Sequence, residues 1–248
     1  MAILNVQAQV KDVLDELDAG GKRQVPFALA LALTRNAQRG QKVVIRTMSQ
    51  VFDNPTPRTL QGTRVVPARK NALTAAVLIK DEGAKGTAPE KYLKAEVEGG
   101  QRNLKRSERA LQFFGKLPAG MQWVVGSGAP IDQYGNLSGG YMTRLLSILQ
   151  SHIDPTSNTT SKSARRNAKK ERPIYFVGRP GGGRLPFGVY QRFQFMWGSA
   201  IKPILIFTRP THYKQRLRFK ELIQMTVTED FHEDFRLALA DALKTAKP

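Results

Sequence analysis

The order in which helix-like and strand-like segments follow one another limits the fold of this chain more than any single motif does. Segments with the periodicity of amphipathic helices stand at both ends, and β-rich runs lie among further helical segments between them. This order does not match the regular strand–helix alternation of a doubly wound parallel sheet. We therefore expect an α+β fold, in which a small antiparallel sheet and hairpins pack with a long N-terminal helix and a C-terminal helix.

Apolar spacing and stop signals locate the helices. Residues 1–19 predict a short amphipathic helix that stops at Gly20-Gly21, and Pro26 opens a second helix of about 25 residues. The sequence DNPTP at 53–57 ends that second helix. Further helices are expected at 104–114, at 138–150 with Ser138 as the N-cap, and at the C-terminal Phe231, Phe235, Leu239 and Leu243, which are spaced by four.

Two β-rich runs, 63–69 and 72–80, flank Lys70-Asn71 and predict a hairpin. Pro67 lies inside the first run and cannot donate a ladder hydrogen bond, so this strand is expected at an edge of its sheet. The region 82–103 shows little periodicity and is interpreted as a loop, with a short strand at YLKAEVE.

Three more strand-like runs lie at 173–178, 189–197 and 202–208, and the stretch GRPGGGRLPFG (178–188) joins the first two. A phosphate-binding loop needs a Lys-Ser/Thr pair and a helix after its glycines, whereas a strand follows here. We interpret the stretch as the tip of a hairpin. Arg179 and Arg184 could still bind a phosphate from this tip, so phosphate binding stays open as an alternative.

Composition divides the chain into three parts. Residues 1–151 form an N-terminal α+β part, and 173–248 contain the hairpin, a strand and the C-terminal helix. Between them, 152–172 have no large apolar residue after Ile153 and are rich in basic residues, which predicts a mobile basic loop. We expect the two outer parts to pack together as a single domain.

Charge and cysteine content narrow the functional classes. The chain of 248 residues has 39 Lys and Arg against 20 Asp and Glu, a net charge of +19, which favours nucleic acid, acidic proteins or anionic membranes as partners. It has no cysteine, which excludes disulfides and thiolate metal sites and fits synthesis in a reducing cytosol. The sequence contains neither a signal-peptide pattern nor a stretch long enough to span a membrane.

Catalytic motifs are missing from the sequence. His152, His212 and His232 are isolated from one another and lack metal-binding spacing. The GSG at 126–128 does not have the G-x-S-x-G pattern of a nucleophile elbow. We therefore expect no enzyme, no cofactor and no metal site.

Basic clusters are the candidate interaction residues. They lie in the basic loop, at the glycine-rich tip and before the C-terminal helix: Arg165, Arg166, Lys169, Lys170, Arg179, Arg184, Lys214, Arg216 and Arg218. Such clusters fit nonspecific phosphate binding. A solvated surface, or a seam against an acidic partner subunit, explains them about as well.

Several segments of the sequence resemble those of a known family. The segment VPFALALALTRNAQRGQKVVIRTMSQVFDNPTPRTLQG with the following VVPARKNALTAAVLIKD is similar to the N-terminal half of tailed-phage neck and tail-completion proteins, with lambda-type minor tail protein Z as the comparison. The stretches KYLKAEVEGGQRNLKRSERAL, LPAGM, DQYGNLSGG and KPILIFTRPTHYKQRLRF resemble phage and prophage proteins of this size. The resemblance spans most of the chain except 152–172 and contains no invariant motif.

The resemblance implies a virion structural protein at the head–tail junction, made in the host bacterial cytoplasm. Such proteins form a ring of six or twelve copies around the DNA channel and join the portal or connector to the tail. The implied partners are copies of itself, portal, connector or tail proteins, and DNA in the channel as a further candidate, with no membrane. The alternatives are a nucleic-acid-binding or packaged internal phage protein and, more remotely, a hydrolase.

Overall fold

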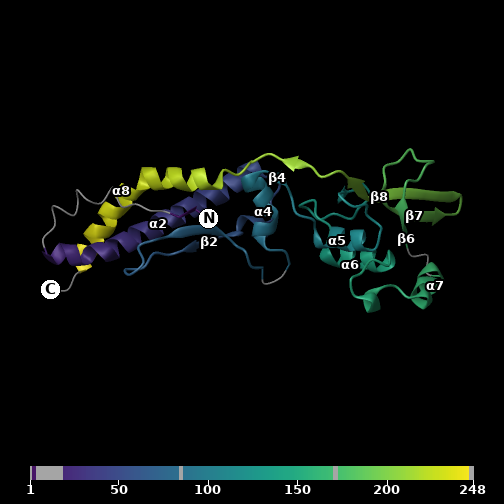
Figure 1. Cartoon of the computed structure of the whole chain (residues 1–248), viewed down its shortest axis with the longest axis horizontal. Coiled ribbons are helices and arrows are strands. Elements are labelled where there is room, and N and C mark those ends of the chain that lie inside the picture. The colour runs from purple at the N-terminus through teal and green to yellow at the C-terminus, as the bar shows by residue number, and fades with distance from the viewer. Residues whose placement is uncertain (1, 4–18, 84–85, 170–172, 246–248) are drawn as a thin grey trace. The chain divides into compact units, whose positions relative to one another are not determined.

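The structure is a computed structural model that describes residues 2–3, 19–83, 86–169 and 173–245 (Figure 1). It shows two compact units: unit 1 comprises Met1–Gly100 and Tyr213–Pro248, and unit 2 comprises Gln101–His212. The expected α+β class is confirmed, because a long N-terminal helix packs against a C-terminal helix and the sheets are small and antiparallel. The chain crosses between the units in β4 (Gly100–Gln101) and β9 (His212–Tyr213), which pair with each other.

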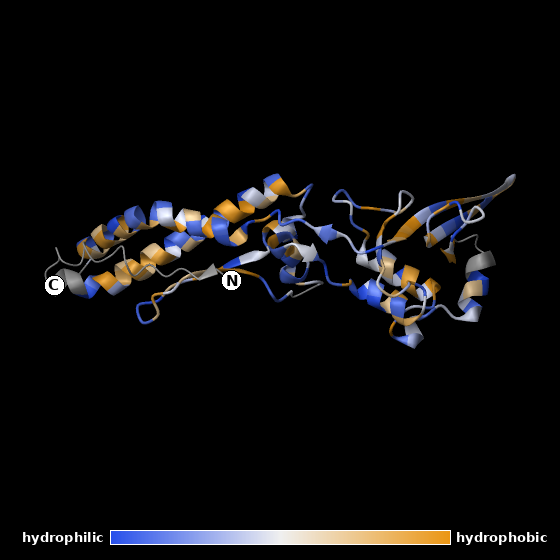
Figure 2. Ribbon diagram, turned by 45° about the horizontal axis from the view of Figure 1, so that its top comes forward, coloured by the Kyte–Doolittle hydropathy of each residue, from blue (hydrophilic) through white to orange (hydrophobic). Residues whose placement is uncertain are grey.

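Unit 1 is built on two long helices, α2 (Ala19–Val51) and α8 (Phe219–Thr245), which pack along each other. Figure 2 shows apolar and polar residues interleaved along both of them, as expected for helices with one buried face. The small buried residues Ala28, Ala32 and Ala37 of α2 let the helices approach closely, and Phe231 and Phe235 of α8 fill the core around them. The expected apolar spacing of α8 is thus confirmed, although its last member, Leu243, is exposed.

The start of α2 differs from the sequence-based expectation. The helix includes Gly20-Gly21, which were expected to be a stop, and Pro26 lies inside it rather than opening it. The expected helix at 1–19 falls mostly on residues 4–18, outside the described residues. Val25 and Ala28, on either side of Pro26, are buried in the core, so packing outweighs the local cost of the proline. The predicted end was right, because α2 stops at Val51, just before DNPTP.

A polar layer interrupts the apolar contact between α2 and α8. The side chain of Asp234 is only 2% exposed and forms an ion pair with Arg39 at 2.9 Å. Asn36, which is also buried, donates from Nδ2 to Asp234 at 3.5 Å. Buried polar partners of this kind pair only in one alignment of the helices, so they select the register of α2 against α8.

The expected hairpin at Lys70-Asn71 is present. Strands β2 (Thr63–Val66) and β3 (Ala76–Ile79) pair antiparallel from Thr63↔Ile79 to Val66↔Ala76. The sheet order is β1–β3–β2, with β1 at Ala2–Ile3, so β2 lies at an edge. This is the position that Pro67, just after β2, predicts. The short helix α3 (Pro57–Leu60) precedes the hairpin.

The expected loop over 82–103 is wrong for its second half, which forms helix α4 (Pro89–Glu98). The alternation in YLKAEVE resembles a strand, but Pro89, Leu93 and Val97 are spaced by four. Pro89 occupies the first turn, where its missing N–H costs nothing, and Leu93 packs into the core of unit 1. Helical packing of these residues therefore overrides the strand-like alternation.

Unit 2 contains a four-stranded antiparallel sheet of order β5–β8–β7–β6. Its strands are β5 (Gln122–Val125), β6 (Ile174–Gly178), β7 (Gly188–Phe195) and β8 (Gly198–Thr208). The three strand-like runs after residue 172 are thus confirmed. The GRPGGGRLPFG stretch is a hairpin connection, because Gly178 pairs with Gly188 across β6 and β7.

Helices α5 (Arg106–Phe113) and α6 (Gly139–Ile148) complete the core of unit 2. Their positions match the expected helices within a few residues, and Ser138 caps α6 by accepting from the backbone N–H of Tyr141 at 3.2 Å. The core is a cluster of apolar residues from these helices and the sheet: Leu111, Trp123, Leu145, Leu149, Val189, Leu205 and Phe207.

The basic stretch 152–172 is not a loop throughout, as the sequence analysis expected. It contains a short 3₁₀ turn at Pro155–Ser157 and helix α7 (Ser161–Lys169). The hydroxyl of Thr160 accepts from the backbone N–H of Ser163, and the following Ala, Arg and Lys are good helix formers. The boundaries at 151 and 173 also differ from the structure, where 152–172 lie inside unit 2 and 213–248 return to unit 1.

Candidate interaction surfaces

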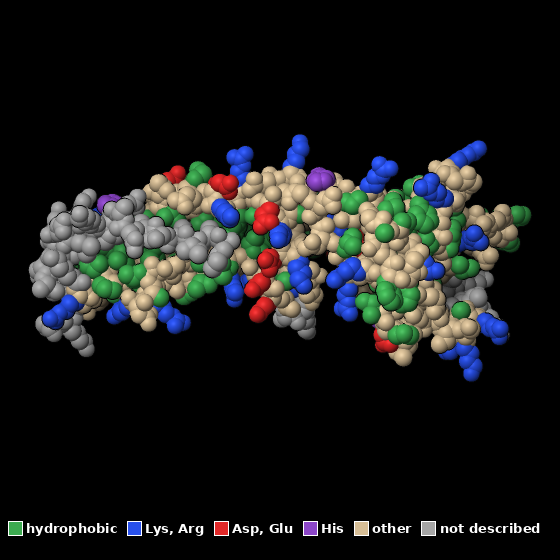
Figure 3. Space-filling model, viewed as in Figure 1, with side chains coloured by type: hydrophobic (Ala, Val, Ile, Leu, Met, Phe, Trp, Pro, Cys, Tyr) green, Lys and Arg blue, Asp and Glu red, His purple; other side chains and the backbone are tan. Residues whose placement is uncertain are grey.

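Unit 2 carries most of the excess positive charge. Its residues, Gln101–His212, include 17 Lys and Arg and four Asp and Glu, a net charge of +13, whereas unit 1 has 22 and 16, a net charge of +6. On the face that Figure 3 shows, Lys and Arg side chains are widely spread, while most visible Asp and Glu side chains gather on one part of the surface. Unit 2 is therefore the part that a polyanion would meet most favourably.

The acidic residues of unit 2 that the structure describes are engaged in local structure. Glu108 is fully buried and accepts from both Nη atoms of Arg102, at 2.8 and 2.6 Å. It also accepts from the backbone N–H groups of Lys105 at 2.6 Å and Trp123 at 2.9 Å. Burial opposes its ionisation, but these hydrogen bonds outweigh burial and lower the pKa of Glu108 below 4.5.

Asp132 and Asp154 fix turns in the same unit. Asp132 accepts from the backbone N–H groups of Tyr134 and Asn136, and Asp154 accepts from the N–H and the hydroxyl of Thr156. The hydrogen bonds from Thr156 lower the pKa of Asp154. Glu171 lies outside the described residues. The described carboxylates of unit 2 thus hold its own core and turns together.

Lys105 forms the other side of the Glu108 cluster. Its Nζ lies 3.8 Å from the centre of the Trp123 ring, which stabilises a cation. Burial of the amine and the nearby positive charge of Arg102 nevertheless lower the pKa of Lys105 to about 8. Sequence analysis missed this cluster, although Glu108 is the lone acid among Arg102, Lys105, Arg106 and Arg109.

The candidate basic residues are divided between the two units. In unit 2, Arg165 and Arg166 are exposed on α7, and Arg179 and Arg184 are exposed in the β6–β7 connection, where Gly181, Gly182 and Gly183 adopt positive φ angles. Lys169 is the last residue of α7, and Lys170 lies outside the described residues. Exposure leaves the four described arginines available to a partner.

The remaining candidates, Lys214, Arg216 and Arg218, lie in unit 1 just before α8. Arg216 is not free, because its guanidinium binds both carboxylate oxygens of Glu96, at 2.7 and 2.9 Å, and lies 5.5 Å from the Phe52 ring centre. The hydrogen bonds to Glu96 raise the pKa of Arg216 further. Arg216 therefore ties the segment before α8 to α4 and is a structural residue, while Lys214 and Arg218 are exposed.

An exposed apolar tip on the β7–β8 hairpin is a surface that the sequence analysis missed. Phe195, Met196 and Trp197 are 56%, 89% and 89% exposed. Phe195 pairs with Gly198, and Met196-Trp197 form the two-residue turn. A signal was present in the sequence, since FQFMWG carries apolar residues into a turn, where polar residues are usual. We call Phe195, Met196 and Trp197 the hairpin tip.

The hairpin tip extends past the rest of the sheet. The last residue of β7 that pairs with β6 is Arg192, and β5 pairs with β8 only over Leu205–Thr208. Figures 1 and 2 both show the hairpin reaching beyond the other strands of unit 2. Two cations flank its base: Arg192 lies 5.1 Å from the Phe176 ring centre, and Nζ of Lys202 lies 4.6 Å from that of Phe193.

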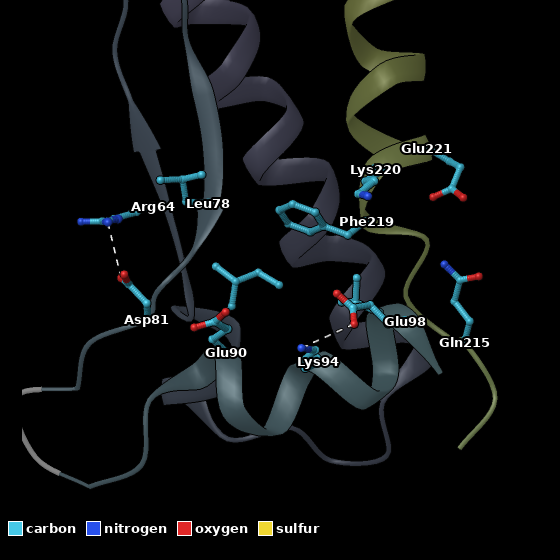
Figure 4. A pocket seen from close by; sticks show the side chains of 12 residues that line it. Arg64, Leu78, Asp81, Glu90, Lys94, Glu98, Gln215, Phe219, Lys220 and Glu221 are labelled. Carbon is cyan, nitrogen blue, oxygen red and sulfur yellow. Dashed lines mark hydrogen bonds and ion pairs between the residues drawn. The ribbon is translucent and has the colours of Figure 1, made fainter. Parts of the chain in front are cut away.

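Unit 1 contains a pocket of about 680 Å³ between the β2–β3 hairpin, α4 and the start of α8 (Figure 4). Apolar side chains of Leu78, Ile79, Val97 and Phe219 line it. Its charged lining residues are Arg64, Asp81, Glu90, Lys94, Glu98, Lys220 and Glu221. Two of the carboxylates are paired, Asp81 with Arg64 at 3.4 Å and Glu98 with Lys94 at 3.8 Å. We call this the α4–α8 pocket.

Comparisons with known proteins return no relative. No family model matches the chain, and neither the curated proteins nor the solved structures contain a significant match. Among the described residues, no group of three or more His, Asp or Glu could hold a metal ion. In the same segments, none of the helices is both long and apolar enough to cross a bilayer.

Proposed function

We propose that this chain is a virion structural protein that completes the neck or tail of a tailed phage. In this role, several copies form a ring around the DNA channel at the head–tail junction and join the portal or connector to the tail. The resemblance of its sequence to neck and tail-completion proteins supplies the phage context.

The observation that carries the proposal is the surface of unit 2. One compact unit combines a net charge of +13 with an apolar hairpin tip that is left in solvent. Exposed apolar groups of this size are typical of protein–protein contacts, and dense positive charge suits a neighbour that is itself a polyanion. A subunit that binds other proteins beside a DNA channel needs both properties.

The charge of unit 2 also favours a second candidate, a nucleic-acid-binding or packaged internal phage protein. Arg165, Arg166, Arg179 and Arg184 would then contact phosphates, and binding would weaken steeply with salt. This candidate explains the basic surface but gives the hairpin tip no role. The neck or tail protein accounts for both features.

Two measurements separate the candidates. Mass spectrometry of purified particles should find the chain in several copies per particle if it is structural. Absence from particles, together with salt-dependent elution from DNA-cellulose, would favour the nucleic-acid-binding candidate. Replacing Arg165, Arg166, Lys169 and Lys170 by alanine tests the basic segment, because unchanged assembly and infectivity would show its charge to be dispensable.

A further inference from the structure

We propose that the hairpin tip of one copy of this chain binds in the α4–α8 pocket of a second copy. The contact is head-to-tail, because the tip belongs to unit 2 and the pocket to unit 1. The inference deepens the proposed function by naming how neighbouring copies would meet, and it rests on that function only for the closure of a ring around DNA.

The tip has the properties of an inserted group. Phe195, Met196 and Trp197 are consecutive, mostly exposed and held on a tight turn, so their backbone is ordered before binding. Within the tip, Phe195 pairs with Gly198, and Met196 and Trp197 form the turn, so no large side chain lies opposite Phe195. Rings opposite small residues are not covered from across the hairpin. Aromatic and methionine side chains in such positions are characteristic anchors of protein interfaces.

The pocket has the properties of a receptor for that group. Its volume of about 680 Å³ lies within the range of pockets that enclose large apolar groups. Leu78, Ile79 and Val97 are only partly buried, so they can still gain by being covered. The pocket is bounded by three separate elements, β3, α4 and the start of α8, which hold it open in the isolated chain (Figure 4).

Charge favours the same pairing. The hairpin approaches with Arg192 and Lys202 beside its base, and the pocket has four carboxylates against three cations in a chain of net charge +19. Asp81 and Glu98 are paired with pocket cations, which leaves Glu90 and Glu221, both exposed, to meet the incoming cations. A second copy therefore supplies the apolar side chains and the opposite charges together.

The proposed contact joins two different surfaces of the chain, and this determines which assemblies it can build. A tip and a pocket on the same chain are two different complementary surfaces, so each copy can bind one neighbour on each side. Such heterologous contacts build a ring if the rotation between copies closes, and an open filament if it does not. The smallest closed arrangement is a reciprocal dimer, in which each copy inserts its tip into the pocket of the other.

Purified full-length chain tests the contact by sedimentation and light scattering over a range of concentrations. Wild type should associate into dimers or larger species as its concentration rises, whereas Trp197→Ser and the double variant Glu90→Lys, Glu221→Lys should each be monomeric. An equal mixture of the two defective proteins should give dimers, because only one functional tip–pocket contact remains. Phe113→Ser, which removes an aromatic that is 83% exposed elsewhere in unit 2, should assemble like wild type.

The absence of cysteine allows a direct test of proximity. Trp197→Cys combined with Lys220→Cys should give a ladder of disulfide-linked oligomers under mild oxidation, while Phe113→Cys with Lys220→Cys should not. Wild type that stays monomeric at the highest soluble concentration, unchanged assembly of the tip and pocket variants, or an internal crosslink without a ladder would overturn the proposal. Trp197 emission that shifts with duplex DNA, in a chain that remains monomeric, would also overturn it. None of these results depends on the particle assay, so the proposed function can fail separately.

Discussion

Replacing Glu108 by glutamine should lower the stability of unit 2 by about 3–5 kcal/mol, the usual cost of removing one partner from a buried ion pair. The carboxylate accepts four hydrogen bonds, two of them from Arg102, whose side chain is only 15% exposed. A neutral amide cannot accept all four, and it removes the negative charge that the Arg102 guanidinium contacts. Both tryptophans of the chain, Trp123 and Trp197, lie in unit 2, so urea unfolding followed by fluorescence reports on this unit.

The matched control is Glu233→Gln, because Glu233 also binds an arginine through two hydrogen bonds, to Arg236, but on an exposed helix surface. This control, followed by circular dichroism, should show little change in stability. The difference between wild type and Glu108→Gln should also depend on pH. Because folding lowers the pKa of Glu108, its contribution is complete above about 4.5 and is lost as the pH falls through the lower folded value. A loss no larger than that of the control, or a difference that stays constant into acid, would refute this account of the cluster.

Three further predictions concern other parts of the chain. Lys105 should be acylated faster than the other lysines near pH 8, as mass spectrometry of partially labelled protein can measure, because its pKa is lowered to about 8; ordinary labelling would contradict that environment. Asp234→Ala should destabilise unit 1 by about 3 kcal/mol, as thermal unfolding followed by circular dichroism can measure. Asp241→Ala, which removes an exposed ion pair, should change the stability little, and equal effects of the two variants would argue against the polar layer. Gly188→Ala should destabilise the β6–β7 hairpin, because a Cβ at Gly188 would collide with the Leu205 carbonyl oxygen. Its pairing partner Gly178 has room for a Cβ, so Gly178→Ala is the control. Equal melting temperatures for the two alanine variants would be inconsistent with this packing.

Local sequence signals predicted the structure correctly where one physical rule determines the local conformation. Ser138 marks the start of α6 because a hydroxyl there satisfies a free backbone N–H. Lys70-Asn71 marks the β2–β3 turn because β-rich runs flank it on both sides. Both features depend on residues close together in the chain, so the sequence predicts them without knowledge of the tertiary contacts.

The sequence-based predictions were wrong where tertiary contacts determine the secondary structure. Pro26 predicted the start of a helix, but α2 continues through it because the neighbouring residues pack into the core with α8. The alternation around Leu93 predicted a strand, but the segment is helical because Leu93 is buried in the core of unit 1. The contact of Glu108 with the backbone of Trp123 joins a helix to a strand, and the exposure of Trp197 depends on how far the β7–β8 hairpin extends past β6 and β5, so both depend on tertiary contacts.

The most direct test of the central claim is the number of copies of this chain in purified phage particles, measured by quantitative mass spectrometry against the portal protein. A ring at the head–tail junction predicts a fixed number, six or twelve per particle, that stays bound through gradient purification and high salt. A number well below one per particle, or a content that falls away with salt, would contradict the role of a neck or tail-completion protein.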